Sequence, residues 1–127
     1  MRSDLLFETD RFNLTEPKDY FINPCCFGDD VAAWLREELI KFNLDVSEPG
    51  QEDWGWHLYV DGHFLGIAGT PKHSSSNLGE WRLMVKKRYS LLARLTGSHK
   101  MSDGNELIKI LKRVIDSHSD LQAIGME

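Results

Sequence analysis

The chain has 127 residues, of which 41% are hydrophobic and 28% charged, and its formal net charge is −5 at pH 7. This length and composition are typical of one globular domain with its own core, so we expect a single domain over residues 1–127. They exclude a disordered or low-complexity chain. The acidic balance argues against nucleic-acid binding, which depends on basic residues.

The charges are distributed unevenly along the chain. Residues 1–56 carry a net charge of −8, whereas residues 57–127 carry +3. Two differently charged faces of one domain produce such asymmetry without any partner, and so does an acidic binding surface. If the acidic part is a binding surface, we expect a basic protein partner.

Cysteine usage and hydropathy indicate a cytoplasmic protein. The two cysteines are adjacent, at Cys25 and Cys26, and a bond between neighbours closes no stabilising loop. We expect buried, unreactive thiols because the flanking residues are apolar. The sequence shows neither the apolar core of a signal peptide nor about 18 consecutive apolar residues, so we expect no membrane association.

In the first third of the chain, residues 1–9 are predicted to form a loose arm and residues 11–15 a short strand. Helical spacing predicts a helix over residues 29–42, with two carboxylates at its N-terminus, where they are favourable. A short strand over residues 44–46 and a turn at residues 48–50 follow. The apolar positions that define the helix are Val31, Trp34, Leu35, Leu39 and Phe42.

A hairpin is predicted with its register. Asp61-Gly62 is a strong type I′ turn signal between strands over residues 54–60 and 63–69. Alternation places Trp56, Leu58, Val60, Leu65 and Ile67 on a core face, and Trp54 is assigned to the same face. The opposite face is mixed and partly aromatic, which is unusual for a solvated face; it carries Gly55, His57, Tyr59, Phe64, Gly66 and Ala68.

The second half of the chain is predicted to contain a mobile loop over residues 70–79 and a strand over 81–86. Helical turns over residues 89–95 precede a helix over 103–117, and residues 121–124 could add an edge strand. Asp103 and Glu106 have capping-box spacing. These elements predict a two-layer α+β domain, in which two main helices pack on one face of an antiparallel sheet of about four to five strands.

No motif predicts catalysis, a metal or a cofactor. The five histidines lack ligand spacing, and the sequence contains no HExxH, paired CxxC, GxGxxG or GxSxG motif. A small basic cluster at residues 86–88 is typical of a solvated strand end. We therefore expect no catalytic residue, no metal and no cofactor.

An acidic segment that runs into tryptophans is the best candidate for a site. Three carboxylates precede Trp54 and Trp56, an arrangement that resembles the charged rim and aromatic anchor of a protein interface. A solvated loop that leads into a core strand, with Trp56 buried, explains the same pattern. The predicted protein-binding residues are Glu48, Glu52, Asp53 and Trp54.

The segment over residues 48–56, followed by the Asp61-Gly62 hairpin, resembles small uncharacterised bacterial α+β proteins. The first predicted helix and residues 91–97 fit the same resemblance. It implies an α+β fold in a bacterial protein, and it brings no activity and no site residues.

Two functional hypotheses follow. The first is a non-catalytic, acidic, cytoplasmic protein-binding module, for example an inhibitor of the immunity or anti-defence type that covers a basic target. The alternative is a small enzyme or small-molecule binder with a pocket between sheet and helix, formed by His57, Tyr59 and Cys26. Nucleic-acid binding ranks third, and a homo-oligomer paired through an edge strand stays open.

Overall fold

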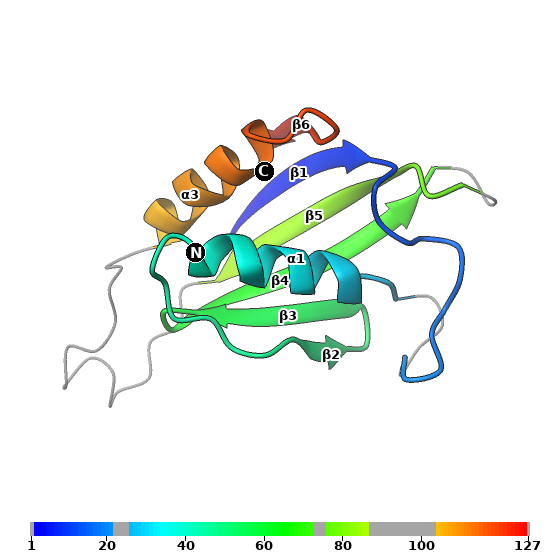
Figure 1. Ribbon diagram of the computed structural model, residues 1–127, viewed down its shortest axis with the longest axis horizontal. Helices are drawn as coiled ribbons and strands as arrows, with labels where there is room; N and C mark the ends of the chain where they lie inside the picture. The colour runs from blue at the N-terminus through cyan, green and yellow to red at the C-terminus, as the bar shows by residue number, and fades with distance from the viewer. Residues whose placement is uncertain (1, 22–25, 73–75, 87–103, 127) are drawn as a thin grey trace.

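The computed structural model describes residues 2–21, 26–72, 76–86 and 104–126. Within them it is an α+β protein with an open antiparallel sheet of six strands and two helices (Figure 1). In chain order the elements are β1 (Arg2–Thr9), α1 (Asp29–Ile40), β2 (Gly50–Glu52), β3 (Gly55–Val60), β4 (His63–Pro71), β5 (Gly79–Lys86), α3 (Gly104–Asp116) and β6 (Gln122–Met126).

The strand order is β2-β3-β4-β5-β1-β6, so the sheet is larger than the four to five strands expected. The additional strands lie where the sequence predicted other structure. The prediction of a loose arm over residues 1–9 is wrong, because β1 pairs with β5 along its length and with β6 on its other side. Consecutive apolar residues explain this interior position, since Leu5 and Phe7 face the helices while Leu6 is buried on the opposite face.

The central hairpin has the predicted register. Trp56 pairs with Ile67 and Val60 with His63, and the turn residues have the positive φ angles of a type I′ turn, 48° at Asp61 and 86° at Gly62. On the other side of β3, residues 50–52 form the short strand β2, where the sequence predicted only a turn.

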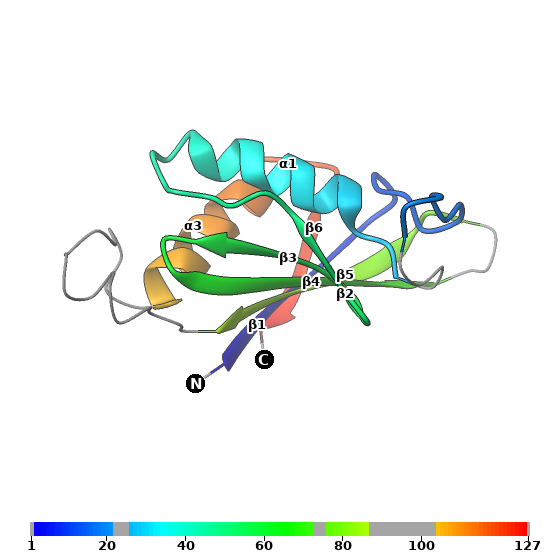
Figure 2. The same cartoon turned by 90° about the horizontal axis from the view of Figure 1, so that it is seen from below.

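Both helices cover one face of the sheet (Figure 2). Helix α1 lies against β3, and α3 lies against β1, β5 and β6. Burying each of the large side chains in this layer stabilises the fold by about 1.5–3 kcal/mol. The core formed by this layer includes Phe7, Val31, Leu35, Leu39, Leu58, Leu65, Leu83, Leu107, Leu111 and Ile115.

Several predicted boundaries differ from the structure. Residues 11–15 form irregular chain rather than a strand, and residues 44–46 contribute one isolated bridge, Val46 to Val60. Helix α1 ends at Ile40, just before Asn43 with a φ of 64°. The predicted loop over residues 70–79 is shorter, because β4 extends through Pro71 and β5 begins at Gly79. The predicted helical turns over residues 89–95 and the cap at Asp103 lie outside the described residues.

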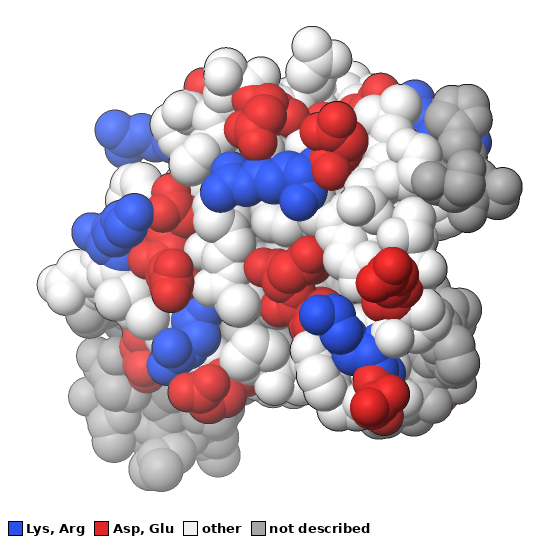
Figure 3. All heavy atoms as spheres, turned by 45° about the vertical axis from the view of Figure 1, so that its right-hand side comes forward, with Lys and Arg blue, Asp and Glu red and all other residues white. Residues whose placement is uncertain are grey.

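The surface charges are mixed where they can be seen. Lys and Arg side chains are interspersed with Asp and Glu on the face drawn in Figure 3. Nucleic-acid binding would require basic side chains gathered into a patch or stripe. Neither α1 nor the described part of α3 is long and apolar enough to span a membrane.

Candidate binding site

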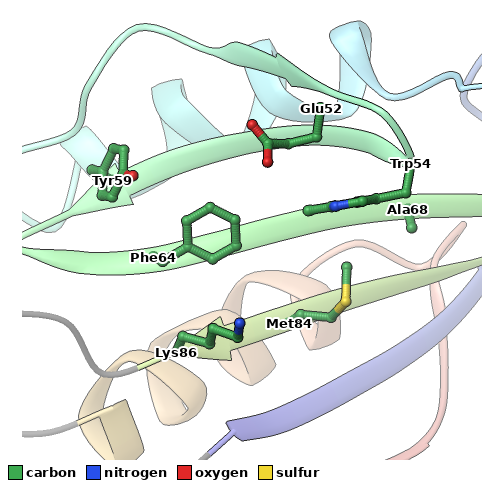
Figure 4. Close-up of a pocket in the computed structure, with 7 residues that line it drawn as sticks. All are labelled: Glu52, Trp54, Tyr59, Phe64, Ala68, Met84 and Lys86. Atoms are coloured by element: carbon green, nitrogen blue, oxygen red, sulfur yellow. The ribbon is translucent and has the colours of Figure 1, made fainter. Parts of the chain in front are cut away.

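The face of the sheet that faces away from the helices carries the candidate site. Strand alternation directs His57 and Tyr59 of β3 toward this open face, together with Phe64 and Ala68 of β4 and Met84 of β5. In Figure 4 the helices lie behind the sheet, and the labelled side chains stand on its near side. The mixed hairpin face noted in the sequence is thus the face of the sheet that lies opposite α1 and α3.

A pocket of about 460 Å³ lies on this open face. This volume is within the range of about 300–1,000 Å³ that is usual for ligand pockets. Aromatic and sulfur-containing side chains form its floor, and one acidic and one basic side chain lie at opposite sides (Figure 4). Its lining residues are Glu52, Trp54, Tyr59, Phe64, Ala68, Met84 and Lys86.

Phe64 is the centre of an aromatic cluster. Its ring centroid lies 5.8 Å from that of Tyr59 and 6.3 Å from that of Trp54, and both pairs are edge-to-face. The imidazole of His57 stacks beside it at 5.5 Å with an interplanar angle of 22°. Such pairs contribute about 0.5–1.5 kcal/mol each beyond area burial, so the rings form one ordered floor.

Two glycines create the space for these rings. A Cβ atom on Gly66 would lie 2.8 Å from Cη2 of Trp54 and 3.0 Å from Cε of Met84. A Cβ atom on Gly50 would lie 2.4 Å from Cε1 of His57. Real Cβ contacts are not this short, so any larger residue would displace these side chains.

The charged groups of the pocket come from opposite sides of the hairpin. Glu52 reaches over β3, and the Lys86 side chain extends from the end of β5 (Figure 4). Oε2 of Glu52 lies 3.1 Å from Nδ1 of His57. This distance permits an ion pair when the imidazole is protonated, but Nδ1 lacks the alignment of a hydrogen bond.

The structure brings together residues from both sequence hypotheses. Glu52 and Trp54 were predicted as protein-binding residues and Tyr59 as a pocket residue, and all three line the same pocket. His57 borders it through its contacts with the other rings. The pocket lies on the open sheet face, so the prediction that it lies between sheet and helix is wrong.

Three other predicted residues lie elsewhere. Glu48 is highly exposed, and its Oε1 atom lies 3.3 Å from Nη2 of Arg36 in α1, on the helix-covered side of the molecule. Asp53 is exposed in the turn between β2 and β3 but does not line the pocket. Cys26 also lies outside the pocket lining, and its Sγ atom is 3.1 Å from the carbonyl oxygen of Asp53.

Cys26 is disulfide-bonded in the structure, so the prediction of a buried free thiol is wrong at this position. Its carbonyl oxygen accepts a hydrogen bond of 3.2 Å from Nε1 of Trp56. Trp56 is buried opposite Ile67, which confirms the structural interpretation of that tryptophan. Cys25 lies outside the described residues.

Four residues of the pocket are not among the predicted site residues; they are Phe64, Ala68, Met84 and Lys86. The hairpin register already placed Phe64 and Ala68 on the same face as Tyr59. Met84 and Lys86 required the pairing of β4 with β5, in which Phe64 lies opposite Lys86. No local sequence signal specifies that pairing.

A second polar cluster joins α1 to the chain beyond α3. Nε2 of His118 lies 3.1 Å from Oε1 of Glu38, and Nη1 of Arg11 lies 3.4 Å from Nδ1 of the same ring. The arrangement fits an imidazole that donates from Nε2 and accepts at Nδ1. Because both nitrogens are engaged, the cluster holds elements together rather than offering a base.

Among the described residues there is no group of three or more His, Cys, Asp or Glu side chains that could bind a metal. Comparisons with protein-family models, curated proteins and solved structures find no match to this chain.

Proposed function

We propose that this protein is a non-catalytic binding module that takes a protein partner on the open face of its sheet. The observation that carries the proposal is the pocket floored by Trp54, Tyr59 and Phe64, on the sheet face opposite the two described helices, α1 and α3. Trp54 and Tyr59 are 41% and 40% exposed, so a partner can reach their rings.

The composition of the open face supports this function. Protein interfaces are enriched in Trp, Tyr, Phe and Met at their centres and are polar at their rims. Here the aromatic residues and Met84 form the centre, while Glu52 and Lys86 lie at the sides. Energetically dominant interface residues are also commonly Trp and Tyr in well-packed surroundings.

The size of the face also suits a protein partner. Six strands of 3 to 9 residues, spaced about 4.8 Å apart with a rise of about 3.3 Å per residue, give a projected area on the order of 600 Å². A standard protein–protein interface buries about 800 Å² on each partner. The open face with its surrounding loops therefore has the extent of one side of such an interface.

The charged side chains of the open face support a basic partner. Where side chains are described, the open face carries four carboxylates and three cations, a small acidic excess; they are Asp4, Glu8, Glu52 and Glu80, and Lys72, Arg82 and Lys86. Lys72 pairs with Glu8, and Arg82 pairs with Asp4. An acidic surface accelerates association with a basic protein through long-range attraction. A cytoplasmic inhibitor of the immunity or anti-defence type, covering a basic target, would use such a face.

Site-specific photo-crosslinking tests the proposal. A photoreactive phenylalanine replaces Tyr59 on the open face or, as a matched control, Phe42, which is equally exposed beyond the end of α1. In cells of the source organism we expect a defined crosslinked protein from position 59 that is absent from position 42. The crosslink should weaken when Glu52→Lys is added. Identical products from both positions, or none from position 59, would contradict the proposal.

The pocket volume favours a second candidate, the binding of a small molecule. A volume of about 460 Å³ can hold a compact ligand without a protein partner. Native mass spectrometry of protein purified from its source separates the candidates. A retained small molecule that is lost in Trp54→Ala would favour this second function, and a retained protein partner the first.

A further inference from the structure

We infer that the pocket receives an arginine side chain of the partner, with its guanidinium group between the carboxylate of Glu52 and the aromatic floor. This inference rests on the proposed function, because it specifies the partner group that the open face recognises. It commits to a protein segment that carries an exposed arginine.

The carboxylate of Glu52 lies where it can bind a guanidinium group in the pocket. Among the seven residues drawn in Figure 4, Glu52 is the only one with a carboxylate, and its side chain points across β3 toward Phe64. The side chain is only 34% exposed, so a cation beside it would be partly shielded from water. Such shielding strengthens an ion pair relative to one that is fully exposed.

The aromatic floor of the pocket also favours a guanidinium group. A cation over the face of Trp, Tyr or Phe is attracted by the ring electrons, and arginine makes this contact more often than lysine. The planar guanidinium group stacks on a ring and can bond a carboxylate at the same time. The protein already makes this contact elsewhere, since the guanidinium carbon of Arg11 lies 5.1 Å from the ring centroid of Trp34.

A basic group lies opposite Glu52 in the pocket. Lys86 is exposed and lines the other side of the pocket (Figure 4). Its ammonium group disfavours a second cation on that side of the pocket and favours a carboxylate of the partner. The recognised segment is therefore expected to carry an acidic residue beside its arginine, so that the two opposite charges fix its direction across the sheet.

NMR titration with three small probes tests the inference. The probes are the N-acetyl, N-methylamide derivatives of arginine, of citrulline, which is a neutral isostere, and of lysine. The reporter is the methyl group of Met84, whose carbon lies beside Gly66 in the pocket. We expect saturable shifts with the arginine probe, and about five- to tenfold weaker binding of citrulline, the size of one partly shielded ion pair with a ring contact.

Substitutions in the pocket test which side chains bind the arginine probe. Glu52→Gln should reduce the affinity for the arginine probe to that for citrulline, whereas Glu48→Gln, on the helix-covered side, should leave it unchanged. Trp54→Leu should weaken the binding of both probes, and Phe42→Leu should weaken neither. An unchanged backbone amide spectrum for each variant shows that its fold is retained.

Equal affinity for arginine and citrulline, an unaffected Glu52→Gln variant, or the absence of a Met84 shift with arginine would overturn the inference. A lysine probe that binds as tightly as arginine would overturn the choice of arginine. These results leave the crosslinking test intact: a partner crosslinked from position 59 without dependence on arginine would contradict the inference but not the proposed function.

Discussion

The imidazole of His57 lies directly above Gly50 on the neighbouring strand. A Cβ atom at position 50 would be 2.4 Å from Cε1 of that ring. The ring also packs against Tyr59 and Phe64, so it has little room to move aside. The absence of a side chain at position 50 thus supports the aromatic floor of the pocket.

Gly50→Ala is expected to destabilise the fold by about 1–3 kcal/mol, the usual cost of overpacking. Urea denaturation monitored by circular dichroism measures the change. The matched control is Gly125→Ala in β6, where a Cβ atom would meet no neighbour within 4 Å and the change should stay within about 0.5 kcal/mol. Equal stabilities of the two variants would show that the His57 ring shifts freely.

Gly66→Ala is expected to change the pocket more than the stability. The added Cβ atom would contact the indole of Trp54, and that residue is 41% exposed at the end of a turn and can swing outward. We expect a loss of about 1 kcal/mol or less in the free energy of unfolding, together with at least a severalfold drop in crosslinking from position 59. Unchanged crosslinking would mean that the position of Trp54 does not control partner binding.

Arg82→Met is expected to be costly because it leaves a carboxylate buried. Nη1 of Arg82 donates a hydrogen bond to Oδ2 of Asp4, and Asp4 is only 3% exposed. Removing one member of a largely buried ion pair costs about 2–3 kcal/mol, somewhat below the value for a fully buried pair. Lys72→Met, which removes the more exposed partner of Glu8, is the control and should cost less than about 1 kcal/mol. Similar midpoints in urea for both variants would refute this difference.

The stability that the contact between Glu38 of α1 and His118 contributes should depend on pH. A hydrogen bond from Lys41, and then one from His118, lowers the pKa of the Glu38 carboxyl in the folded protein. A carboxyl group whose pKa is lower in the folded than in the unfolded protein stabilises the fold at pH values above the unfolded-state pKa, which is about 4.3 for Glu. This stabilisation is lost as the pH falls through the folded-state pKa.

Glu38→Gln should therefore be less stable than the wild-type protein at pH 7, by about 1 kcal/mol or less, and the difference should narrow below about pH 4. Thermal unfolding between pH 3 and 7 measures this. Glu37→Gln, at the exposed neighbouring position of α1, is the control and should stay within about 0.5 kcal/mol at pH 7. A difference that stays constant across this pH range would assign the effect to packing.

The local parts of the fold could be predicted from sequence because local chemistry specifies them. The Asp61-Gly62 turn fixes the register of β3 and β4, and the spacing of Val31, Leu35 and Leu39 defines the buried face of α1. The position of β1 could not be predicted in this way. Its partner β5 lies about 75 residues further along the chain. No local sequence signal specifies the pairing of two strands that are so far apart; it depends on the assembly of the whole sheet.

The candidate site could also be predicted only where local sequence signals specify it. Hairpin register alone placed Tyr59 and Phe64 on one face, but it could not show that the helices leave this face uncovered. Strand alternation, extended into the turn, predicts that Trp54 lies on the core face, whereas its indole lies over Gly66 on the open face. Side-chain direction in a turn depends on the local backbone, so alternation fails there.

The insertion of β1 between β5 and β6 makes the two ends of the chain depend on each other. Strand β6 joins the sheet only through β1, so proteolytic removal of residues 2–9 would detach β6 and deprive α3 of much of its support. During synthesis on the ribosome, β1 emerges before its partner β5 and cannot pair with it until β5 has followed. Residues 2–9, with three consecutive apolar side chains, then need protection from premature association while the rest of the sheet is made.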